Sequence, residues 1–135
     1  MVRYLQLNSR SDFPALSYEN PFKVLLISDV STSNIWKSEI GEWLIENGCL
    51  YACVYGIESD AWSDLLDFSV DTLYEFEDVP EDRRIITTVH ADRNECMHFF
   101  KVHAKHPKCK TNESVILHIS KASNENEVLA SYESA

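Results

Sequence analysis

Apolar positions along the chain alternate between continuous runs and segments with helical spacing. Continuous apolar runs are typical of strands buried on both faces of a sheet, and here they occupy residues 22–28, 49–55, 84–90 and 114–120. Apolar residues that recur every three or four positions predict helices over about 34–47, 60–78, 93–103 and 124–132. Strands that alternate with helices indicate a parallel sheet.

We therefore predict one α/β domain over residues 1–135, a three-layer sandwich of about four mostly parallel strands with helices on both faces. A flavodoxin-like strand order is expected, in which the run at 22–28 lies between those at 49–55 and 84–90. Residues 1–21 form an N-terminal arm, either an edge strand or a packed extension, and residues 22–135 form the α/β core.

Length and composition agree with a folded domain without a membrane span. The chain has 135 residues, of which 44% are hydrophobic. The start lacks the apolar core of a signal peptide, and no stretch approaches the roughly 20 apolar residues of a membrane span. The four cysteines form no CxxC pair, so a reduced, cytoplasmic protein is expected.

Negative charge is concentrated in one segment. The formal net charge is −10, and residues 58–82 contain ten acidic residues but no lysine or arginine. This balance disfavours direct binding to nucleic acid or to anionic membranes, both of which require basic patches. It is compatible with a positively charged protein partner.

Six carboxylates step by three or four residues along the helix predicted over 60–78, so they fall on one side of it. They are Asp60, Asp64, Asp67, Asp71, Glu75 and Asp78. Five like-charged neighbours would cost the helix about 1–2.5 kcal/mol, so local helix stability does not explain the pattern.

Three interpretations of this row stay open. The carboxylates form a solvated face, or pair with basic residues of the second half (Arg83, Arg84, Lys101, Lys105), or bind a basic protein. Trp62, Phe68 and Tyr74 lie near the row, and whichever of them is exposed would anchor an interface.

A second candidate site follows from the predicted sheet, because ligands bind beyond the carboxyl ends of parallel strands. Asp29, His90 and Asp92 lie at those ends and are candidates for a general base, an orienting carboxylate or a metal ligand. Asp92 also fits a helix cap. His103 and His118 lie on apolar faces and are expected in the core.

Motifs for other chemistry are missing from the sequence. The loop at residues 29–33 contains no glycine, which argues against a phosphate-binding loop. The histidine spacings match no zinc pattern, and no cofactor or metal is expected.

Short sequence words suggest a relationship to other proteins. They include Gly48-Cys49-Leu50-Tyr51, Pro80-Glu81-Asp82, Thr87-Thr88, His90-x-Asp92 and His106-Pro107. Over about residues 21–121 the chain resembles a family of small bacterial proteins of unknown function. This resemblance implies a bacterial, cytoplasmic, single-domain protein, and it assigns no activity, cofactor or catalytic residue.

The leading hypothesis is a non-enzymatic, acidic protein-binding module, such as an immunity or inhibitor protein that docks a basic partner through the helix at 60–78. The alternative is a small enzyme or ligand-binding domain that uses Asp29, His90 and Asp92.

Overall fold

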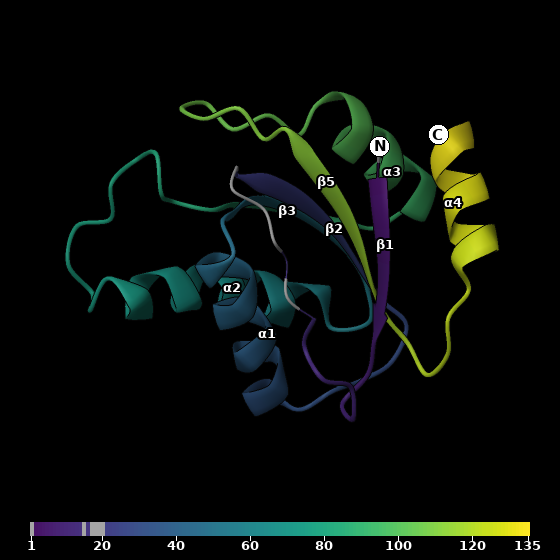
Figure 1. Cartoon of the computed structure of the whole chain (residues 1–135), viewed down its shortest axis with the longest axis horizontal. Helices are drawn as coiled ribbons and strands as arrows, with labels where there is room; N and C mark the ends of the chain where they lie inside the picture. Colours follow the sequence, from purple (N-terminus) through teal and green to yellow (C-terminus); the bar gives the residue numbers. More distant parts are fainter. Residues whose placement is uncertain (1, 15, 17–20) are drawn as a thin grey trace.

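A computed structural model describes residues 2–14, 16 and 21–135, and these residues contain one parallel sheet (Figure 1). Its strands are β1 (Val2–Leu7), β2 (Phe22–Ser28), β3 (Cys49–Gly56), β4 (Ile86–His90) and β5 (Glu113–Ile119). They lie in the order β1-β5-β2-β3-β4, and each neighbouring pair is parallel.

Two helices cover each face of this sheet. The helices α1 (Asn34–Glu46) and α2 (Ser59–Leu73) enclose one apolar cluster, which includes Trp62. The helices α3 (Arg93–Val102) and α4 (Glu125–Ser134) enclose a second cluster on the opposite face, around Phe100. The predicted three-layer α/β sandwich is therefore confirmed. No helix in the described part of the chain is both long and apolar enough to cross a membrane.

The predicted strand order is wrong. Strand β4 lies beside β3 rather than beside β2, and β5 occupies the other side of β2. Right-handed crossovers explain the arrangement: the chain moves outward from β2 to β4 through α1 and α2 on one face, and then returns through α3 on the other. Apolar periodicity gives the strands but not the direction of each crossover.

The N-terminal arm supplies the fifth strand, because β1 pairs with β5 from Val2↔Ser114 to Leu7↔Ile119. Strand β1 lies at one edge of the sheet in the described part of the chain. The arm then returns to the α1 face, where the indole of Trp43 donates to the carbonyl of Pro14 at 3.0 Å. Residues 15 and 17–20 of the arm lie outside the described residues.

Helix α2 is shorter than the sequence predicts, because it ends at Leu73 and not near residue 78. Glu75 and Phe76 adopt left-handed backbone angles, with φ of 55° and 59°. Carboxylates at 75, 77 and 78 would oppose the helix dipole if the helix continued, which is a physical reason for its early end.

Helices α1 and α2 pack closely at Gly41. A Cβ atom placed on Gly41 would lie 2.5 Å from the hydroxyl oxygen of Ser69, so only glycine permits this contact without a shift. The Ser69 hydroxyl donates instead to the Leu65 carbonyl at 2.7 Å. The close contact between Gly41 and Ser69 therefore places the solvent-exposed residues of α1 and α2 on one continuous surface.

Candidate functional site

The helical part of the predicted acidic row lies on the side of α2 that faces β4. At about 100° per residue, Asp60, Asp64, Asp67 and Asp71 fall within one narrow sector of the helix. Asp67 accepts hydrogen bonds from Thr87 of β4 at 3.4 Å, which fixes the direction of this sector. We call these four residues the acidic stripe; Glu75 and Asp78 lie beyond the helix end and are not part of it.

Ion pairs within the protein neutralise little of the negative charge of the stripe. Arg84 approaches Asp71 at 3.8 Å, with both side chains about half exposed. Within the described residues, Asp60 and Asp64 form no ion pair, and neither Arg83 nor the lysines at 101 and 105 pair with the stripe. An exposed pair such as Arg84–Asp71 contributes little to stability, so most of the charge stays uncompensated.

One member of the stripe, Asp67, has a raised pKa. Partial burial raises the pKa of the Asp67 carboxyl, and the charges of Asp64 and Asp71 act in the same direction. The hydrogen bond from Thr87 and the charge of Arg84 oppose the shift without cancelling it. The folded protein therefore tolerates this cluster at an electrostatic cost.

Two exposed aromatic rings lie beside the stripe. The rings of Phe68 and Phe76 are 5.6 Å apart and their residues are 53% and 66% exposed. Leu73, in the last turn of α2, is also exposed. Trp62 is fully buried, and of the three aromatics predicted near the row only Phe68 is largely exposed.

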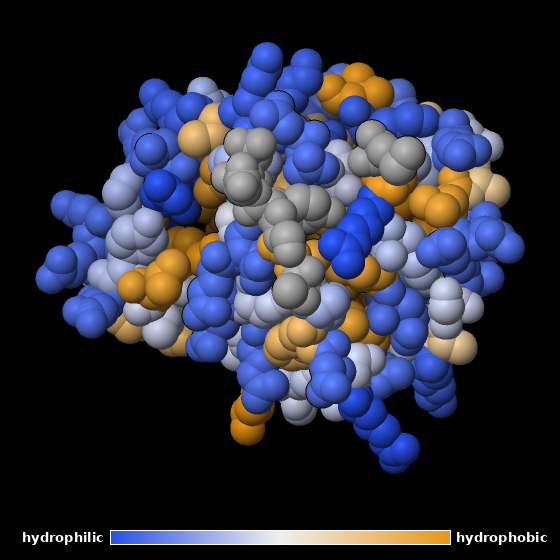
Figure 2. Space-filling view, viewed as in Figure 1, coloured by the Kyte–Doolittle hydropathy of each residue, from blue (hydrophilic) through white to orange (hydrophobic). Residues whose placement is uncertain are grey.

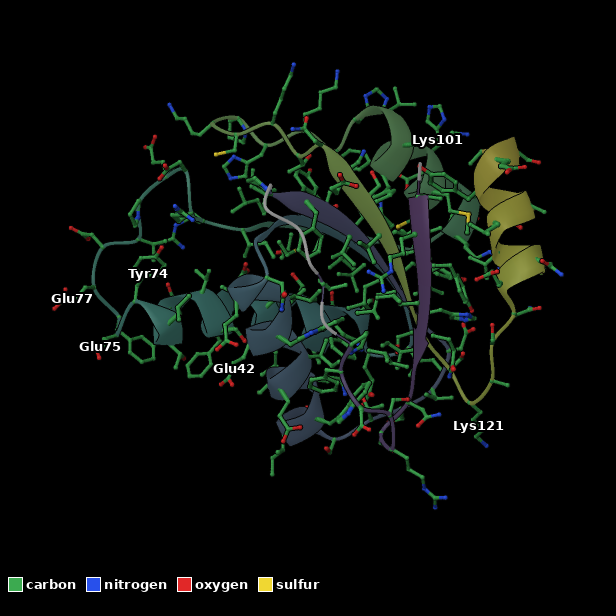
Figure 3. All side chains as sticks on the ribbon, viewed as in Figure 1. Glu42, Tyr74, Glu75, Glu77, Lys101 and Lys121 are labelled. Atoms are coloured by element: carbon green, nitrogen blue, oxygen red, sulfur yellow. The ribbon has the colours of Figure 1, made fainter. Side chains whose placement is uncertain are left out.

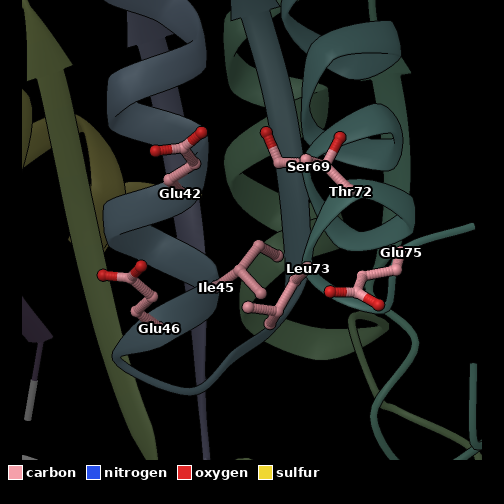
Figure 4. Close-up of a pocket in the computed structure, with 7 residues that line it drawn as sticks. All are labelled: Glu42, Ile45, Glu46, Ser69, Thr72, Leu73 and Glu75. Atoms are coloured by element: carbon pink, nitrogen blue, oxygen red, sulfur yellow. The ribbon is translucent and has the colours of Figure 1, made fainter.

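An acidic groove continues this surface toward α1 (Figure 4). It has a volume of about 300 Å³, with Ile45 and Leu73 meeting at its apolar part. The carboxylates of Glu42 and Glu46 lie on the α1 rim and that of Glu75 on the opposite rim. Figure 3 shows Glu75 and Glu77 beyond the end of α2, and Figure 2 shows apolar side chains among hydrophilic ones at that end of the molecule.

The second candidate site lies at the carboxyl edge of the sheet. Asp29 and His90 line one open hollow of about 380 Å³, together with Tyr55 and Ser59. Both ring nitrogens of His90 are engaged, with Glu95 at 2.6 Å and Thr88 at 2.8 Å. The third predicted residue, Asp92, does not line the hollow, because its carboxylate caps α3 by accepting from the Glu95 amide.

His118, predicted as a core histidine, is buried but bonds to Asp29, a partnership that the sequence did not reveal. Its Nε2 lies 2.5 Å from the Asp29 carboxylate, and its Nδ1 lies 2.6 Å from the Tyr4 hydroxyl. The Asn124 amide donates to that hydroxyl at 3.1 Å. If neutral His118 carries its proton on Nε2, the ring donates to Asp29 and accepts from the Tyr4 hydroxyl, so each polar group in this chain of hydrogen bonds has a partner. Knowledge that β2 and β5 are neighbours would have predicted this contact. His103, by contrast, is exposed.

A buried lysine links two loops at the same edge of the sheet. The Lys37 ammonium is fully buried, donates to the Thr32 carbonyl at 2.6 Å and lies 3.0 Å from the Glu58 carboxylate. Glu58 also accepts from Ser31 and Thr32, and Lys37 lowers the pKa of its carboxyl. Glu58 itself has a left-handed φ of 59°. This contact joins the loops that follow β2 and β3.

Neither candidate site resembles a metal centre or an activated-thiol site. Within the described residues, no group of three or more His, Cys, Asp and Glu side chains is arranged to hold a metal ion. Burial raises the pKa of the Cys49 thiol to about 12 and that of Cys53 to about 11, so both are protonated at neutral pH.

Comparison with known proteins gives a family. Residues 2–135, nearly the whole chain, match the model of a domain of unknown function, DUF7684. The protein belongs to the DUF7684 family. No curated protein and no solved structure matches it. A function for this DUF7684 domain must therefore be argued from its own residues.

Proposed function

We propose that this DUF7684 protein is a non-enzymatic protein-binding module whose acidic surface engages a basic, partly apolar protein. The main supporting observation is the exposed pair Phe68 and Phe76 near the carboxyl end of α2, the helix that carries the acidic stripe and contributes Leu73 to the α1–α2 groove. Exposed aromatic residues surrounded by charged ones are typical of binding surfaces, because aromatic anchors supply affinity and the charges supply orientation.

Electrostatics favours a cationic partner. Residues 58–82 contain ten acidic residues and no basic one, and Glu42 and Glu46 add negative charge across the groove. Such a field accelerates encounters with a basic surface and opposes encounters with an acidic one. Apolar contact with Phe68, Phe76 and Leu73 would then slow dissociation.

An immunity or inhibitor protein is the most specific role that we propose. A basic toxin site would meet this surface with complementary charge, and an apolar side chain of the toxin would fill the groove of about 300 Å³. We place this role in the cytoplasm, because Cys49, Cys53, Cys96 and Cys109 are all unpaired thiols.

Selection from a displayed library of random twelve-residue peptides tests the proposal with a defined probe. The wild-type protein is expected to enrich peptides that combine lysine or arginine with a large apolar residue. The double variant Asp60→Lys/Asp64→Lys should lose this preference. A control variant, Glu125→Lys/Glu133→Lys, changes the charge equally on α4 and should keep it. If wild-type protein enriches no basic peptides, the proposal is wrong.

Ligand binding or catalysis at the carboxyl edge is the second candidate. The specific observation in its favour is that the Asp29 carboxylate, about half exposed, is oriented by buried His118 while it lines a hollow shared with His90. A fragment screen by ligand-observed NMR tests it. Hits should compete with one another and disappear in Asp29→Asn, whereas hits unaffected by that substitution would eliminate this candidate.

A further inference from the structure

We propose that the basic partner adds an extended strand to the free edge of β4, with alternate lysine or arginine side chains directed at the acidic stripe. This inference rests on the proposed function and specifies how the acidic stripe, one part of that surface, is recognised. It commits the partner to a segment in β conformation in which cationic and apolar residues alternate.

Strand β4 is positioned to pair with an added strand. Among the described residues, β4 is the last strand on its side and pairs only with β3, from Tyr51↔Ile86 to Tyr55↔His90. An edge strand offers backbone donors and acceptors to another strand. Residues 86–90 contain no lysine or proline, which commonly protect such edges, and Val89 is 42% exposed.

Helix α2 runs beside strand β4 and the residues just before it. Ser59 and His90 line the same hollow, the Ser63 and Thr87 hydroxyls are 3.0 Å apart, and Asp71 lies 3.8 Å from Arg84. The residue numbers rise along α2 as they fall along β4, so the two elements are antiparallel.

The acidic stripe is directed toward the β4 side of α2. Helix α1 packs on one side of α2, through Gly41 and Ser69, and the stripe lies toward the other side, where Asp67 meets Thr87. The carboxylates therefore border the space beside β4 that an added strand would occupy. Side chains on one face of that strand would point toward the stripe.

The spacing of charges fits a strand. Alternate residues of a strand are about 6.6–6.8 Å apart. Neighbouring stripe carboxylates rise along the helix by about 4.5–6 Å, at 1.5 Å per residue. Two or three consecutive cations at alternate positions would each meet a carboxylate.

A second copy of this chain is a poor occupant of the same edge. Pairing of two β4 strands would bring two acidic stripes together, including Asp60 and Asp64, which have no ion-pair partner among the described residues. A basic strand removes this repulsion. Charge complementarity therefore favours a basic partner over a second copy of this chain at the β4 edge.

The test uses a blocked ten-residue peptide of alternating Lys and Val, with fluorescence anisotropy for affinity. A Glu/Val peptide of the same length is the charge control. Two further peptides are N-methylated, one at every lysine and the other at every valine. These two have the same charge and composition but lose opposite edges of the strand, since amides at alternate residues point in opposite directions.

We expect one N-methylated peptide to bind within threefold of the unmodified peptide and the other to bind at least tenfold more weakly. Amide exchange at residues 87–89 should slow on binding. Equal affinity of the two N-methylated peptides would overturn strand addition while leaving charge-driven binding, and hence the proposed function, intact. Failure of the unmodified peptide to exceed the Glu/Val control would also overturn strand addition; the random-library selection then decides the proposed function separately.

Discussion

The rings of Phe68 and Phe76 lie 5.6 Å apart although the end of α2 separates their residues. Glu75 and Phe76 have left-handed backbone angles, and this turn places the second ring beside the first. The Phe76 amide donates to the Asp71 carbonyl at 2.8 Å, which closes this turn. The acidic surface thus gains an apolar centre that a regular helix would not provide.

The aromatic pair should matter for binding and not for folding. We expect Phe68→Ser/Phe76→Ser to change the free energy of unfolding by only about 0.5 kcal/mol, because both residues are largely exposed. The same substitutions should weaken binding of library-selected basic peptides by about 2 kcal/mol or more, as for truncated aromatic anchors. Urea unfolding and calorimetric titration measure the two effects. A large loss of stability with unchanged affinity would show that the pair is structural.

The left-handed turn should have a measurable cost. A non-glycine residue in this conformation is disfavoured by roughly 1–2 kcal/mol, so Glu75→Gly should raise the free energy of unfolding by about 1 kcal/mol. Glu77→Gly removes an equal charge at a position without positive φ and is the matched control. Urea unfolding should show a gain for the first variant only; equal effects would indicate that charge, and not backbone strain, is responsible.

The Asp67 carboxyl should make stability fall as pH rises. The folded-state pKa of Asp67 is raised above its ordinary 3.8, so the folded state holds this proton more tightly and loses stability as pH increases through that pKa. Asp67→Asn should stabilise the protein at pH 7 by about 0.4–1 kcal/mol through relief of two like-charged contacts. At pH 3 the two proteins should be equally stable.

Asp60→Asn is the control for this prediction. Asp60 lies in the first turn of α2, where a carboxylate interacts favourably with the helix dipole. Its replacement should not stabilise the protein at pH 7. An equal gain from both substitutions would mean that net charge alone determines stability.

The ion pair between Lys37 and Glu58 should stabilise the loops at the carboxyl edge of the sheet. Glu58→Ala leaves the fully buried Lys37 ammonium without its carboxylate, so we expect a marked fall in melting temperature. Glu46→Ala, at an exposed carboxylate on α1, should have little effect.

The stability that the Lys37–Glu58 ion pair contributes in the wild-type protein also depends on pH. The folded-state pKa of Glu58 is lowered, so its contribution is present above the ordinary pKa of 4.5 and is lost as pH falls through the lowered value. Thermal melts between pH 3 and pH 7 measure both effects. Identical pH profiles for wild type and Glu58→Ala would contradict this account.

Most of the fold follows from local patterns in the sequence. Apolar runs gave β2, β3 and β5, and a cap pattern gave α3, where Asp92 accepts from the Glu95 amide at 2.8 Å. Strand order depends on which way each crossover turns, which periodicity does not encode. The contact between Asp29 and His118, which are 89 positions apart, therefore could not be predicted from local patterns.

The candidate surface was predicted in part, for a similar reason. Charge spacing placed Asp60, Asp64, Asp67 and Asp71 on one side of a helix, as the structure has them. Helical periodicity was wrongly extended through Glu75 to Asp78, because a left-handed turn of two non-glycine residues has no clear sequence signal. Exposure of Phe76 follows from that turn.

The most direct test of the proposed binding surface is a ¹⁵N-resolved NMR titration with the tightest basic peptide from the library. The account predicts saturable shifts at amides of residues 64–73 of α2, at the turn over 74–78 and near Glu42 and Glu46, all weakened by added salt. Saturable shifts confined to the α3–α4 face or to the hollow beside Asp29 would contradict it.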